Sequence, residues 1–414
     1  MRRSALVLAA LAFTLCAVTA GCGDDQPSPP ATVGTFGARS PAYLGGLIPV
    51  IDVTADAEAA QPFIVDTGSP VTLLNSVSYG HAQDFSAHET HDLGALGLTF
   101  ETISTVVLGA FPPDACGTPD TAGIIGGDLL HFYQLTVDYL GSALFLWNGI
   151  SASPDIGQDV APAVAVPIRV KGGGRALVGS ITVDLPPTRI IVDGQLESYS
   201  RTFLVDTGAS LVTISNDTFS TLDHTDRPRI ADIPIQTIYG VQNGFITRLA
   251  KVSVGDVTLE SVPAVVVPDP TLFTQIGAEV GETISLFIGG TFLRNYQTTV
   301  RYSAERLDLA RYNNPVHVNP AEFVGPGFDL ASGCNGGLFV ARVYPASSAA
   351  AQNVNVGAQL LTIDTQSVAG MTIDEANRLL HSYQPGDSVT FELQNFTVRT
   401  VTLTYADLLP PYTG

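Results

Sequence analysis

Short apolar runs separated by polar turns recur along most of the chain and predict β-strands. In many runs apolar and polar positions alternate, and glycine, proline, serine or aspartate stands at the ends. The sequence contains 40 glycines and 27 prolines, while charged residues make up only 14%, which favours strands joined by turns over long charged helices. We therefore expect a mainly β protein.

One apolar pattern occurs twice and indicates a duplicated β unit. The run Phe63-Ile-Val-Asp66-Thr-Gly-Ser is repeated as Phe203-Leu-Val-Asp206-Thr-Gly-Ala, and both runs begin like a buried strand. A second signal follows each copy, Gly123-Ile-Ile-Gly126-Gly in the first and Leu286-Phe-Ile-Gly289-Gly in the second. Two further strand-like runs follow each second signal, at 134–139 and 143–147 in one copy and at 297–302 and 306–312 in the other.

The repeat sets the domain boundaries that we predict. The first half spans 45–150 and the second spans 163–314, with a Ser-, Pro- and Gly-rich linker at 151–162 between them. Beyond the second half the pattern changes to further strands and two short helices, one of which begins at a capping box formed by Thr372 and Glu375. This change predicts a separate small α+β domain at 322–405.

The two Asp-Thr-Gly motifs, each with a later apolar-apolar-Gly-Gly signal, resemble those of the aspartic protease superfamily. The resemblance covers roughly residues 45 to 314, and the short halves are more similar to a fused retropepsin dimer than to a pepsin. It implies one cleft in which Asp66 and Asp206 face each other as the catalytic carboxylates. Two carboxylates held together share one proton, so one can take a proton from a bound water while the other donates to the scissile carbonyl. The implied activity is that of an aspartic endopeptidase with no cofactor and no metal, and a monomer suffices because one chain carries both aspartates.

The resemblance also implies supporting roles for the residues around each aspartate. The threonine hydroxyls bond across to the opposite loop, and the glycines of Asp-Thr-Gly leave room for close backbone approach. The later glycines pack under these loops. The supporting residues implied are Thr67, Gly68, Ser69 and Gly126 in the first half, and Thr207, Gly208, Ala209 and Gly289 in the second.

Ser69 suggests how the shared negative charge is distributed. A serine hydroxyl can donate to the nearby carboxylate and favour its charged form, whereas Ala209 cannot. We therefore predict that Asp66 carries the charge more of the time than Asp206.

In this family β-hairpin flaps close over the substrate, and two segments fit such hairpins. Tyr239-Gly240-Val-Gln-Asn-Gly244 fits a hairpin tip, since Asn-Gly favours a tight turn. Leu93-Gly-Ala-Leu-Gly97 is its weaker counterpart in the first half. An ordinary surface hairpin is the alternative for both segments.

The C-terminal segment, from about Glu322 to Tyr405, resembles a bacterial PDZ domain. Asn335-Gly336-Gly337-Leu338-Phe339 matches the carboxylate-binding loop, although it lacks the Gly-Leu-Gly-Phe order of the family. The resemblance implies that backbone amides of this loop capture a chain terminus while the adjacent strand pairs with the peptide. The alternative is a docking module without a peptide ligand.

The N-terminus is typical of an export signal. Arg2 and Arg3 precede an apolar stretch that ends at Thr19-Ala20-Gly21-Cys22, which is the basic, apolar and small-residue order of a secretory signal. The end resembles a bacterial lipobox, which implies acylation of Cys22; an ordinary secretory signal is the alternative. We expect a signal segment at 1–22, a flexible tether at 23–44, and a lipid-anchored protein that faces the periplasm or the exterior.

The net charge of the chain limits the kinds of partner that we expect, and its cysteines bear on the compartment. The net charge of −20 argues against nucleic acid as a partner and against anionic lipid except through the anchor. In an oxidising compartment Cys116 and Cys334 could pair or remain thiols. His88-Glu-Thr-His91 lacks the spacing of a zinc-binding helix, so we expect a polar loop there and no metal site.

Together these patterns predict an aspartic endopeptidase of the cell envelope. Its partners would be polypeptide substrates and a peptide or C-terminus bound by the PDZ domain. The alternative from another functional class is a catalytically silent adaptor, which binds partners through the PDZ domain and uses the duplicated body as a scaffold.

Overall fold

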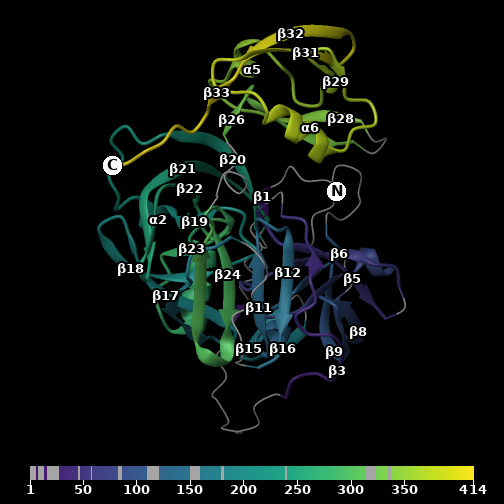
Figure 1. Cartoon of the computed structure of the whole chain (residues 1–414), viewed down its shortest axis with the longest axis vertical. Coiled ribbons are helices and arrows are strands. Elements are labelled where there is room, and N and C mark those ends of the chain that lie inside the picture. The colour runs from purple at the N-terminus through teal and green to yellow at the C-terminus, as the bar shows by residue number, and fades with distance from the viewer. Residues whose placement is uncertain are drawn as a thin grey trace.

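The computed structural model describes residues 6–7, 14–15, 28–44, 47–56, 58–82, 86–109, 121–149, 159–178, 181–237, 240–313, 323–333 and 337–414 (Figure 1). Cys22, Cys116, Cys334, Tyr239 and Gly336 lie outside these ranges. Strands dominate the described part of the chain, which confirms a mainly β protein. No helix in the same ranges is long and apolar enough to cross a lipid bilayer.

The first half is built on a seven-stranded sheet with the order β3-β9-β7-β10-β6-β5-β8. Several of its strands are buried along their whole length, as their apolar sequences predict. The strands are β3 (Thr32–Gly34), β5 (Val50–Ala55), β6 (Gln61–Val65), β7 (Leu73–Asn75), β8 (Ser86–Ala95), β9 (Leu98–Leu108) and β10 (Gly123–Ile125).

The second half is built on a nine-stranded sheet with the order β1-β20-β21-β22-β19-β23-β18-β17-β14. Its outermost strand, β1 (Leu6–Val7), comes from the N-terminal segment and pairs in parallel with β20. The other strands are β14 (Arg169–Lys171), β17 (Arg189–Leu196), β18 (Tyr199–Val205), β19 (Val212–Ser215), β20 (Arg229–Thr237), β21 (Gly240–Val254), β22 (Val257–Val267) and β23 (Leu286–Ile288).

The two sheets repeat one arrangement of four strands. In the first half β10 pairs in parallel with β6 and antiparallel with β7, and β7 pairs in parallel with β9. In the second half β23 pairs in the same directions with β18 and β19, and β19 pairs in parallel with β22. Val65 lies opposite Ile125, and Val205 lies opposite Ile288. The duplication seen in the sequence is therefore a duplication of strand pairing and register.

A third, six-stranded sheet joins the halves. Its central pair is antiparallel and consists of β11 from the first half and β24 from the second, with the Thr136 and Thr299 hydroxyls 2.9 Å apart. Figure 1 shows these strands and β12 side by side between the two halves. The sheet contains β4 (Ser40–Pro41), β11 (Gln134–Asp138), β12 (Ala143–Trp147), β13 (Val164–Pro167), β24 (Tyr296–Arg301) and β25 (Arg306–Arg311).

The main core runs continuously through both halves. Phe63 and Val65 of β6 and Phe203 and Val205 of β18 all belong to this one apolar cluster. Because side chains alternate along a strand, Ile64 and Leu204 face the other way, and they belong to two separate clusters. Each half therefore buries both faces of the strand that leads to its Asp-Thr-Gly loop.

Short helices and one extra hairpin cover the sheets. The longest helix of the body, α3 (Thr271–Val280), packs on the second half through Phe273, Ile276 and Val280. The hairpin of β15 (Gly174–Val178) and β16 (Ile181–Leu185) precedes β17, and β15 also pairs with β2 (Thr14–Leu15). The remaining body helices are α1 (Gly127–Leu130), α2 (Asn216–Phe219), α4 (Gly290–Leu293), and the 3₁₀ turns η1 (Val77–Tyr79) and η2 (Tyr302–Ala304).

The prediction of a polar loop around His88 and His91 is wrong, because these residues lie in strand β8. This strand pairs with β9 over most of its length, and its open face carries polar side chains. His91 Nδ1 lies 2.8 Å from Asp56 Oδ2, and His91 Nε2 lies 3.2 Å from Glu89 Oε2. A strand with one wetted face has the same polar composition as a loop, which explains the error. Among the described residues, no group of three or more histidine, cysteine or acidic side chains could hold a metal ion.

The C-terminal domain, drawn in yellow-green in Figure 1, has its own apolar core and its own sheet, separate from the sheets of the body. Its main path runs in the order β27-β28-β29-β31-β32, and Thr372 and Glu375 form the predicted capping box of α6. Its elements are β26 (Val324–Gly325), β27 (Phe328–Ser332), β28 (Leu338–Val343), α5 (Ser348–Ala351), β29 (Gln359–Ile363), β30 (Gln366–Ser367), α6 (Ile373–Leu380), β31 (Ser388–Gln394), β32 (Val398–Thr404) and β33 (Ala406–Asp407).

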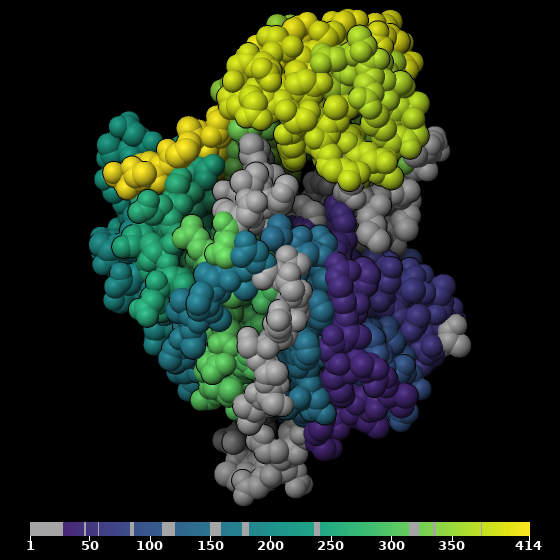
Figure 2. Space-filling model, viewed as in Figure 1, coloured from purple at the N-terminus to yellow at the C-terminus, as the bar shows by residue number. Residues whose placement is uncertain are grey.

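The last residues of the chain return from this domain to the second half of the body, as the yellow segment that reaches the teal atoms in Figure 2 shows. Leu409 is fully buried in the cluster that contains Ile230 of β20 and Ile246 of β21. Arg248 Nε donates to the Leu409 carbonyl at 2.6 Å, and the Tyr412 amide donates to Ser261 Oγ at 2.8 Å. The C-terminal domain is therefore attached to the body at its end as well as at its beginning.

Candidate active site

The two Asp-Thr-Gly loops meet where β6 and β18 end. The Asp66 amide donates to the Ile125 carbonyl at 3.0 Å, and the Asp206 amide donates to the Ile288 carbonyl at the same distance. Each aspartate is thus fixed by the strand that carries the apolar-apolar-Gly-Gly signal of its own half. The structure brings together the two residues that the sequence pattern singled out.

The two loops bond to each other through their threonines. The Thr67 hydroxyl donates to the Val205 carbonyl at 3.0 Å, and the Thr207 hydroxyl donates to the Val65 carbonyl at 2.7 Å. Each hydroxyl also accepts a hydrogen bond from the backbone amide of the other threonine. Four buried hydrogen bonds therefore fix the position of one loop relative to the other.

The glycines of the motifs leave space for the opposite carboxyl. A Cβ atom on Gly68 would lie 2.4 Å from Asp206 Cγ, and one on Gly208 would lie 2.4 Å from Asp66 Cγ. A Cβ on Gly126 or Gly289 would lie 2.1 or 2.2 Å from the carbonyl oxygen of Val71 or Leu211, respectively. All four positions therefore exclude any side chain, and the later glycines do pack under the loops.

The carboxyl groups are fully buried, with 0% exposure of either aspartate. Oδ1 of Asp66 accepts hydrogen bonds from the amides of Gly68 at 2.7 Å and Ser69 at 3.1 Å, and Oδ1 of Asp206 accepts from Gly208 at 2.9 Å. Within the described residues no amide or hydroxyl donates to Oδ2 of either aspartate, and the two carboxyls hydrogen-bond to each other. Both Oδ2 atoms are buried.

Burial raises the pKa of both aspartates. Desolvation, together with the charge of Asp206, raises the pKa of Asp66 well above its ordinary value. Desolvation raises the pKa of Asp206 to about 6, and this rise is opposed first by the hydrogen bond to Asp66 and then by the charge of Arg189. The two carboxyls therefore titrate as one coupled pair that shares a proton.

The structure removes the argument on which the prediction of a negatively charged Asp66 was based. The Ser69 hydroxyl donates to the Val71 carbonyl at 2.8 Å, away from Asp66. Ser69 reaches Asp66 through its backbone amide, which any residue at this position would supply. Ser69 and Ala209 therefore do not differ in the way that the sequence suggested.

Arg189 is a residue of this site that the sequence interpretation missed. Its guanidinium donates through Nη1 to the Gly68 carbonyl, and it pairs with both carboxylate oxygens of Glu279 at 2.9 and 2.8 Å. The Arg189 side chain is 0% exposed, and the Glu279 side chain is 3% exposed. An arginine at the start of an apolar strand was the available signal, but its partners lie 121 and 90 residues away in the sequence.

The faces of the strands that carry the two carboxyls are covered by apolar side chains. Ile64 lies two residues before Asp66, on the same face, and clusters with Val183 and Leu185 of β16. Leu204 has the same relationship to Asp206 and clusters with Phe273 of α3. The extra hairpin and α3 thus each pack against the strand that leads to one of the aspartates.

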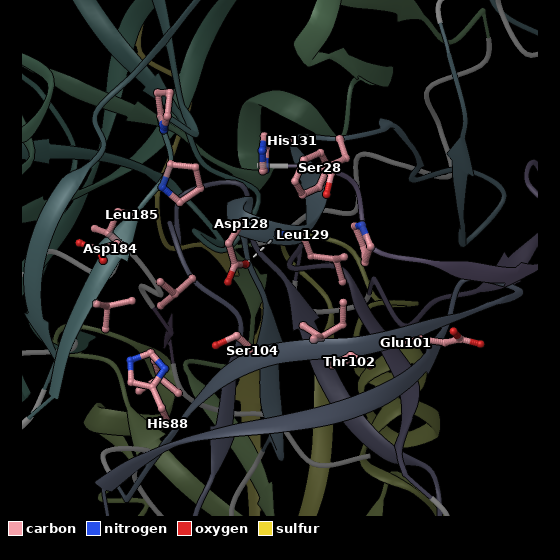
Figure 3. A pocket seen from close by; sticks show the side chains of 18 of the residues that line it. Ser28, His88, Glu101, Thr102, Ser104, Asp128, Leu129, His131, Asp184 and Leu185 are labelled. Atoms are coloured by element: carbon pink, nitrogen blue, oxygen red, sulfur yellow. Dashed lines mark hydrogen bonds between the residues drawn. The ribbon is translucent and has the colours of Figure 1, made fainter. Parts of the chain in front are cut away.

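A cavity of about 790 Å³ opens beside this cover (Figure 3). Figure 3 shows Asp184 and Leu185 of β16 on one side and Asp128 and Leu129 of the first half across from them. Asp66 and Asp206 do not line this cavity. It is therefore a space next to the enclosed dyad and separate from it.

Asp128, in this cavity wall, is a partly buried carboxyl that the sequence interpretation did not single out. It accepts hydrogen bonds from the Thr72 amide at 2.9 Å, the Thr72 hydroxyl at 2.7 Å and the Leu129 amide at 2.8 Å. Desolvation raises its pKa to about 6. In the second half Thr291 takes the equivalent place, and its hydroxyl accepts from the Val212 amide at 2.9 Å.

The expected hairpin around Tyr239 is present, but its turn lies elsewhere than predicted. Thr237 of β20 pairs with Gly240 of β21, and residues 238 and 239 lie outside the described residues. Asn243 and Gly244 lie within β21, opposite Pro234 and Ile233. Gly244 is needed for close packing, because a Cβ there would lie 2.3 Å from the side chain of Ile235.

The segment Leu93–Gly97 does form a hairpin turn, between β8 and β9. It packs against other parts of the first half, with the Gly97 carbonyl accepting from the Thr35 amide at 3.3 Å. Its structural counterpart is the β21–β22 turn, because β9 and β22 pair in the same way with β7 and β19. It is therefore not the counterpart of the β20–β21 hairpin.

The peptide-binding residues expected in the C-terminal domain are misplaced. Leu338 and Phe339 lie in β28, which pairs with β27 on one side and with β29 on the other, so this strand has no edge for a peptide. Gly337 directly precedes it, and Gly336 lies outside the described residues. The edge strands of the sheet are β27 and β32, and α6 contacts β27.

The loop that leads into β27 comes closer to the Gly-Leu-Gly-Phe order. It reads Gly325-Pro326-Gly327-Phe328. Gly327 has φ +100°, and its carbonyl accepts hydrogen bonds from the Tyr344 amide at 2.8 Å and the Ser347 hydroxyl at 3.2 Å. The groove between β27 and α6, headed by this loop, therefore replaces 336–339 as the place where a peptide could add a strand.

The comparisons with known proteins agree with this geometry. Residues 192–295, which include Asp206 and Gly289, match the family described as gag-polyprotein putative aspartyl protease. The second half is an aspartyl-protease-like domain. The first half repeats the strand pairing of this protease-like domain, and residues 319–394 match the PDZ domain family.

Similarity to individual proteins is low. No curated protein matches the chain significantly. Among solved structures, the aspartic proteinase from Irpex lacteus matches with a TM-score of 0.41 and 17% identity, over 68% of this chain and 98% of that chain.

Proposed function

We propose that this protein is an aspartic endopeptidase that hydrolyses polypeptides of the cell envelope, with Asp66 and Asp206 as its catalytic dyad. The observation that carries the proposal is the bonding of Thr67 to Thr207, which holds two buried carboxyls against each other. Two titratable groups whose surroundings push their pKa values apart supply an acid and a base.

The proposed roles follow from the pKa order of the pair. Asp206, which ionises at about pH 6, accepts a proton from a water molecule between the carboxyls. The water oxygen then attacks the scissile carbonyl carbon, while Asp66 donates its proton to the carbonyl oxygen. Collapse of the resulting diol releases the amine and the carboxylic acid products.

Strand β20 supports an extended polypeptide as the substrate. In the described chain its outer edge pairs with Leu6–Val7, in register with Ile235 and Gln236. If residues 1–22 are removed on export, the same edge becomes available to another extended chain, which binds through its backbone and so without strict sequence preference. A C-terminal peptide bound between β27 and α6 would recruit a substrate or partner to the same molecule.

The proposed location is the cell envelope, with acyl chains on Cys22 as the membrane anchor and a monomer as the active form. The sequence order of 1–22 supports this, and one chain supplies both aspartates. Growth with a radioactive fatty acid tests the anchor, since label should enter the wild-type protein and be absent from a Cys22→Ala variant. Label in both proteins, or in neither, would contradict lipidation of Cys22.

A catalytically silent adaptor is the second candidate, and the enclosure of the dyad favours it. Both aspartates are 0% exposed, so a substrate reaches them only if part of the surrounding structure moves. An adaptor would bind peptides through the PDZ domain and leave them intact.

One assay separates the two functions. The purified protein is incubated with denatured casein and with a peptide library between about pH 3 and pH 8, and the products are identified by mass spectrometry. The proposed protease yields new termini at defined bonds. Binding of library peptides without any cleavage, at every pH, would support the adaptor.

A further inference from the structure

Arg189 forms a buried connection between the two halves at the catalytic loop. It is the first residue of β17 in the second half, whereas Gly68, whose carbonyl accepts from Nη1, belongs to the Asp66 loop of the first half. Glu279 lies in α3 and fixes the guanidinium by a two-point contact at 2.9 and 2.8 Å. Glu279 of α3 therefore holds the guanidinium in the orientation in which it donates to the backbone of the opposite half.

Its place relative to the carboxyls follows from the glycine geometry. Gly68 is so close to Asp206 that a Cβ on it would lie 2.4 Å from Asp206 Cγ, and its amide donates to Asp66 Oδ1 at 2.7 Å. The peptide groups of Gly68 thus contact Asp66 and Arg189 directly and lie against Asp206. A change at Arg189 would alter this loop and the electrostatic field at both carboxyls.

The neighbourhood of the dyad contains few other charges in the described part of the chain. The charge of Asp66 acts on Tyr302 and the charge of Asp206 acts on Tyr139, but burial is the main cause that raises the pKa of both phenols, so they stay neutral at acid and neutral pH. Burial lowers the pKa of Arg294 to about 9, so this arginine is charged throughout the acid range. Arg189 differs from these residues because it contacts the catalytic loop directly.

Additional packing holds the connection in place. A Cβ on Gly172 would lie 2.7 Å from Glu279 Oε1 and 3.2 Å from Arg189 Cγ, and a Cβ on Gly127 would lie 2.5 Å from Thr188 Cβ. The backbone on both sides of Arg189 is therefore closely packed, and the guanidinium cannot move away from Gly68 without moving α3 or β17.

We propose that Arg189, held by Glu279, is a positioning residue that orients the Asp66 loop and favours the singly ionised form of the dyad. This inference rests on the proposed function of Asp66 and Asp206. Arg189 touches no reacting atom and acts through the Gly68 peptide and through its charge.

The test uses two double variants, each of which removes one arginine charge and one glutamate charge. Arg189→Gln with Glu279→Gln removes the buried pair without leaving an unpaired buried charge. Arg169→Gln with Glu282→Gln is the matched control, because Arg169 Nε and Nη2 contact Glu282 at 3.1 and 2.7 Å but lie at the surface, where Arg169 also bonds Asp193. Both pairs connect the region around β14 and β17 with α3 or the residues directly after it.

The pH dependence of kcat/KM is measured for the wild type and both variants. Loss of Arg189 should move the acidic limb to higher pH by about one unit, because the opposing charge that favours an ionised carboxyl is gone. It should also lower kcat about tenfold while KM changes little, because the loop loses its support but the substrate contacts remain. The control should match the wild type. If the acidic limb of kcat/KM lies at the same pH in all three proteins, the proposal is overturned, even if the Arg189 variant melts at a lower temperature.

A second readout is independent of catalysis. The unfolding free energy of the wild type should fall as pH rises through the dyad pKa, and the Arg189 variant should show this fall at a pH about one unit higher. If the wild type cleaves nothing but this shift is present, the proposed function fails and the placement of Arg189 stands. If the wild type cleaves substrate and neither the limb nor the unfolding curve moves, the placement fails and the function stands.

Discussion

The backbone amides of Thr67 and Thr207 each donate to the hydroxyl of the other threonine, at 3.0 and 3.1 Å. Each hydroxyl in turn donates a hydrogen bond to the carbonyl of the residue before the opposite aspartate. The two loops therefore cannot adopt their positions independently, and this reciprocal bonding is the structural basis for treating Asp66 and Asp206 as one dyad.

Removing one hydroxyl should disturb both loops. Thr207→Val keeps the shape of the side chain but leaves the Thr67 amide and the Val65 carbonyl without their partner. Each buried group left unsatisfied costs about 1–3 kcal/mol, so we expect a loss of about 2–5 kcal/mol in unfolding free energy and a large loss of kcat. Denaturant unfolding and peptide cleavage measure the two effects.

Thr213→Val is the control for this variant. Thr213 is fully buried in the same half, but its hydroxyl donates only to the nearby Leu211 carbonyl, at 3.3 Å. Thr207→Ser should recover most of the activity, because it restores the hydroxyl. Equal losses in Thr207→Val and Thr213→Val would show that the loop-to-loop bonds have no special importance.

The pH profile should reflect the pKa of Asp206. The active form needs an ionised Asp206 and a protonated Asp66, so kcat/KM should rise as pH increases through about 6. Ser69→Ala should leave this limb in place, because the Ser69 hydroxyl donates to Val71 and not to Asp66. A profile that is already at its maximum near pH 4, or a limb displaced by Ser69→Ala, would disagree with the assignment of charge.

Asp128 should make the fold less stable at neutral pH than at acid pH. Its pKa is raised from 3.8 to about 6, so its contribution to stability is present below pH 3.8 and is lost as pH rises through about 6. The shift corresponds to a loss on the order of 3 kcal/mol. Asp128→Asn should flatten the stability curve between these pH values, as measured by urea unfolding. Parallel curves for the variant and the wild type would refute this.

The sequence predicted the parts of the site whose signal is local. Asp66 and Asp206 follow similar apolar runs, and the repeated register of β6 and β18 is what brings them to equivalent positions. The roles of Gly68 and Gly208 were also readable, because only glycine tolerates a carboxyl at such a distance. In these cases a short motif and a strand period contain the physical information.

The rest depended on contacts between distant segments. Arg189 was passed over because its partners, Gly68 and Glu279, are far away in the sequence. The loop of the PDZ domain was misplaced because Gly336-Gly337 imitates a glycine-rich loop, while the edge position of β27 is a property of the whole sheet. The complete burial of the dyad depends on the tertiary packing around it, which strand and helix patterns do not reveal.

Cleavage of denatured casein by Asp66→Asn and Asp206→Asn tests the central claim most directly. Asp138→Asn serves as the control, because Asp138 is also buried but bonds to the Tyr312 hydroxyl in the sheet between the halves. We predict that each single dyad variant folds and loses at least about a thousandfold in kcat/KM, while the control cleaves at the same bonds as the wild type. Retention of cleavage by either dyad variant would contradict a shared active site formed by Asp66 and Asp206.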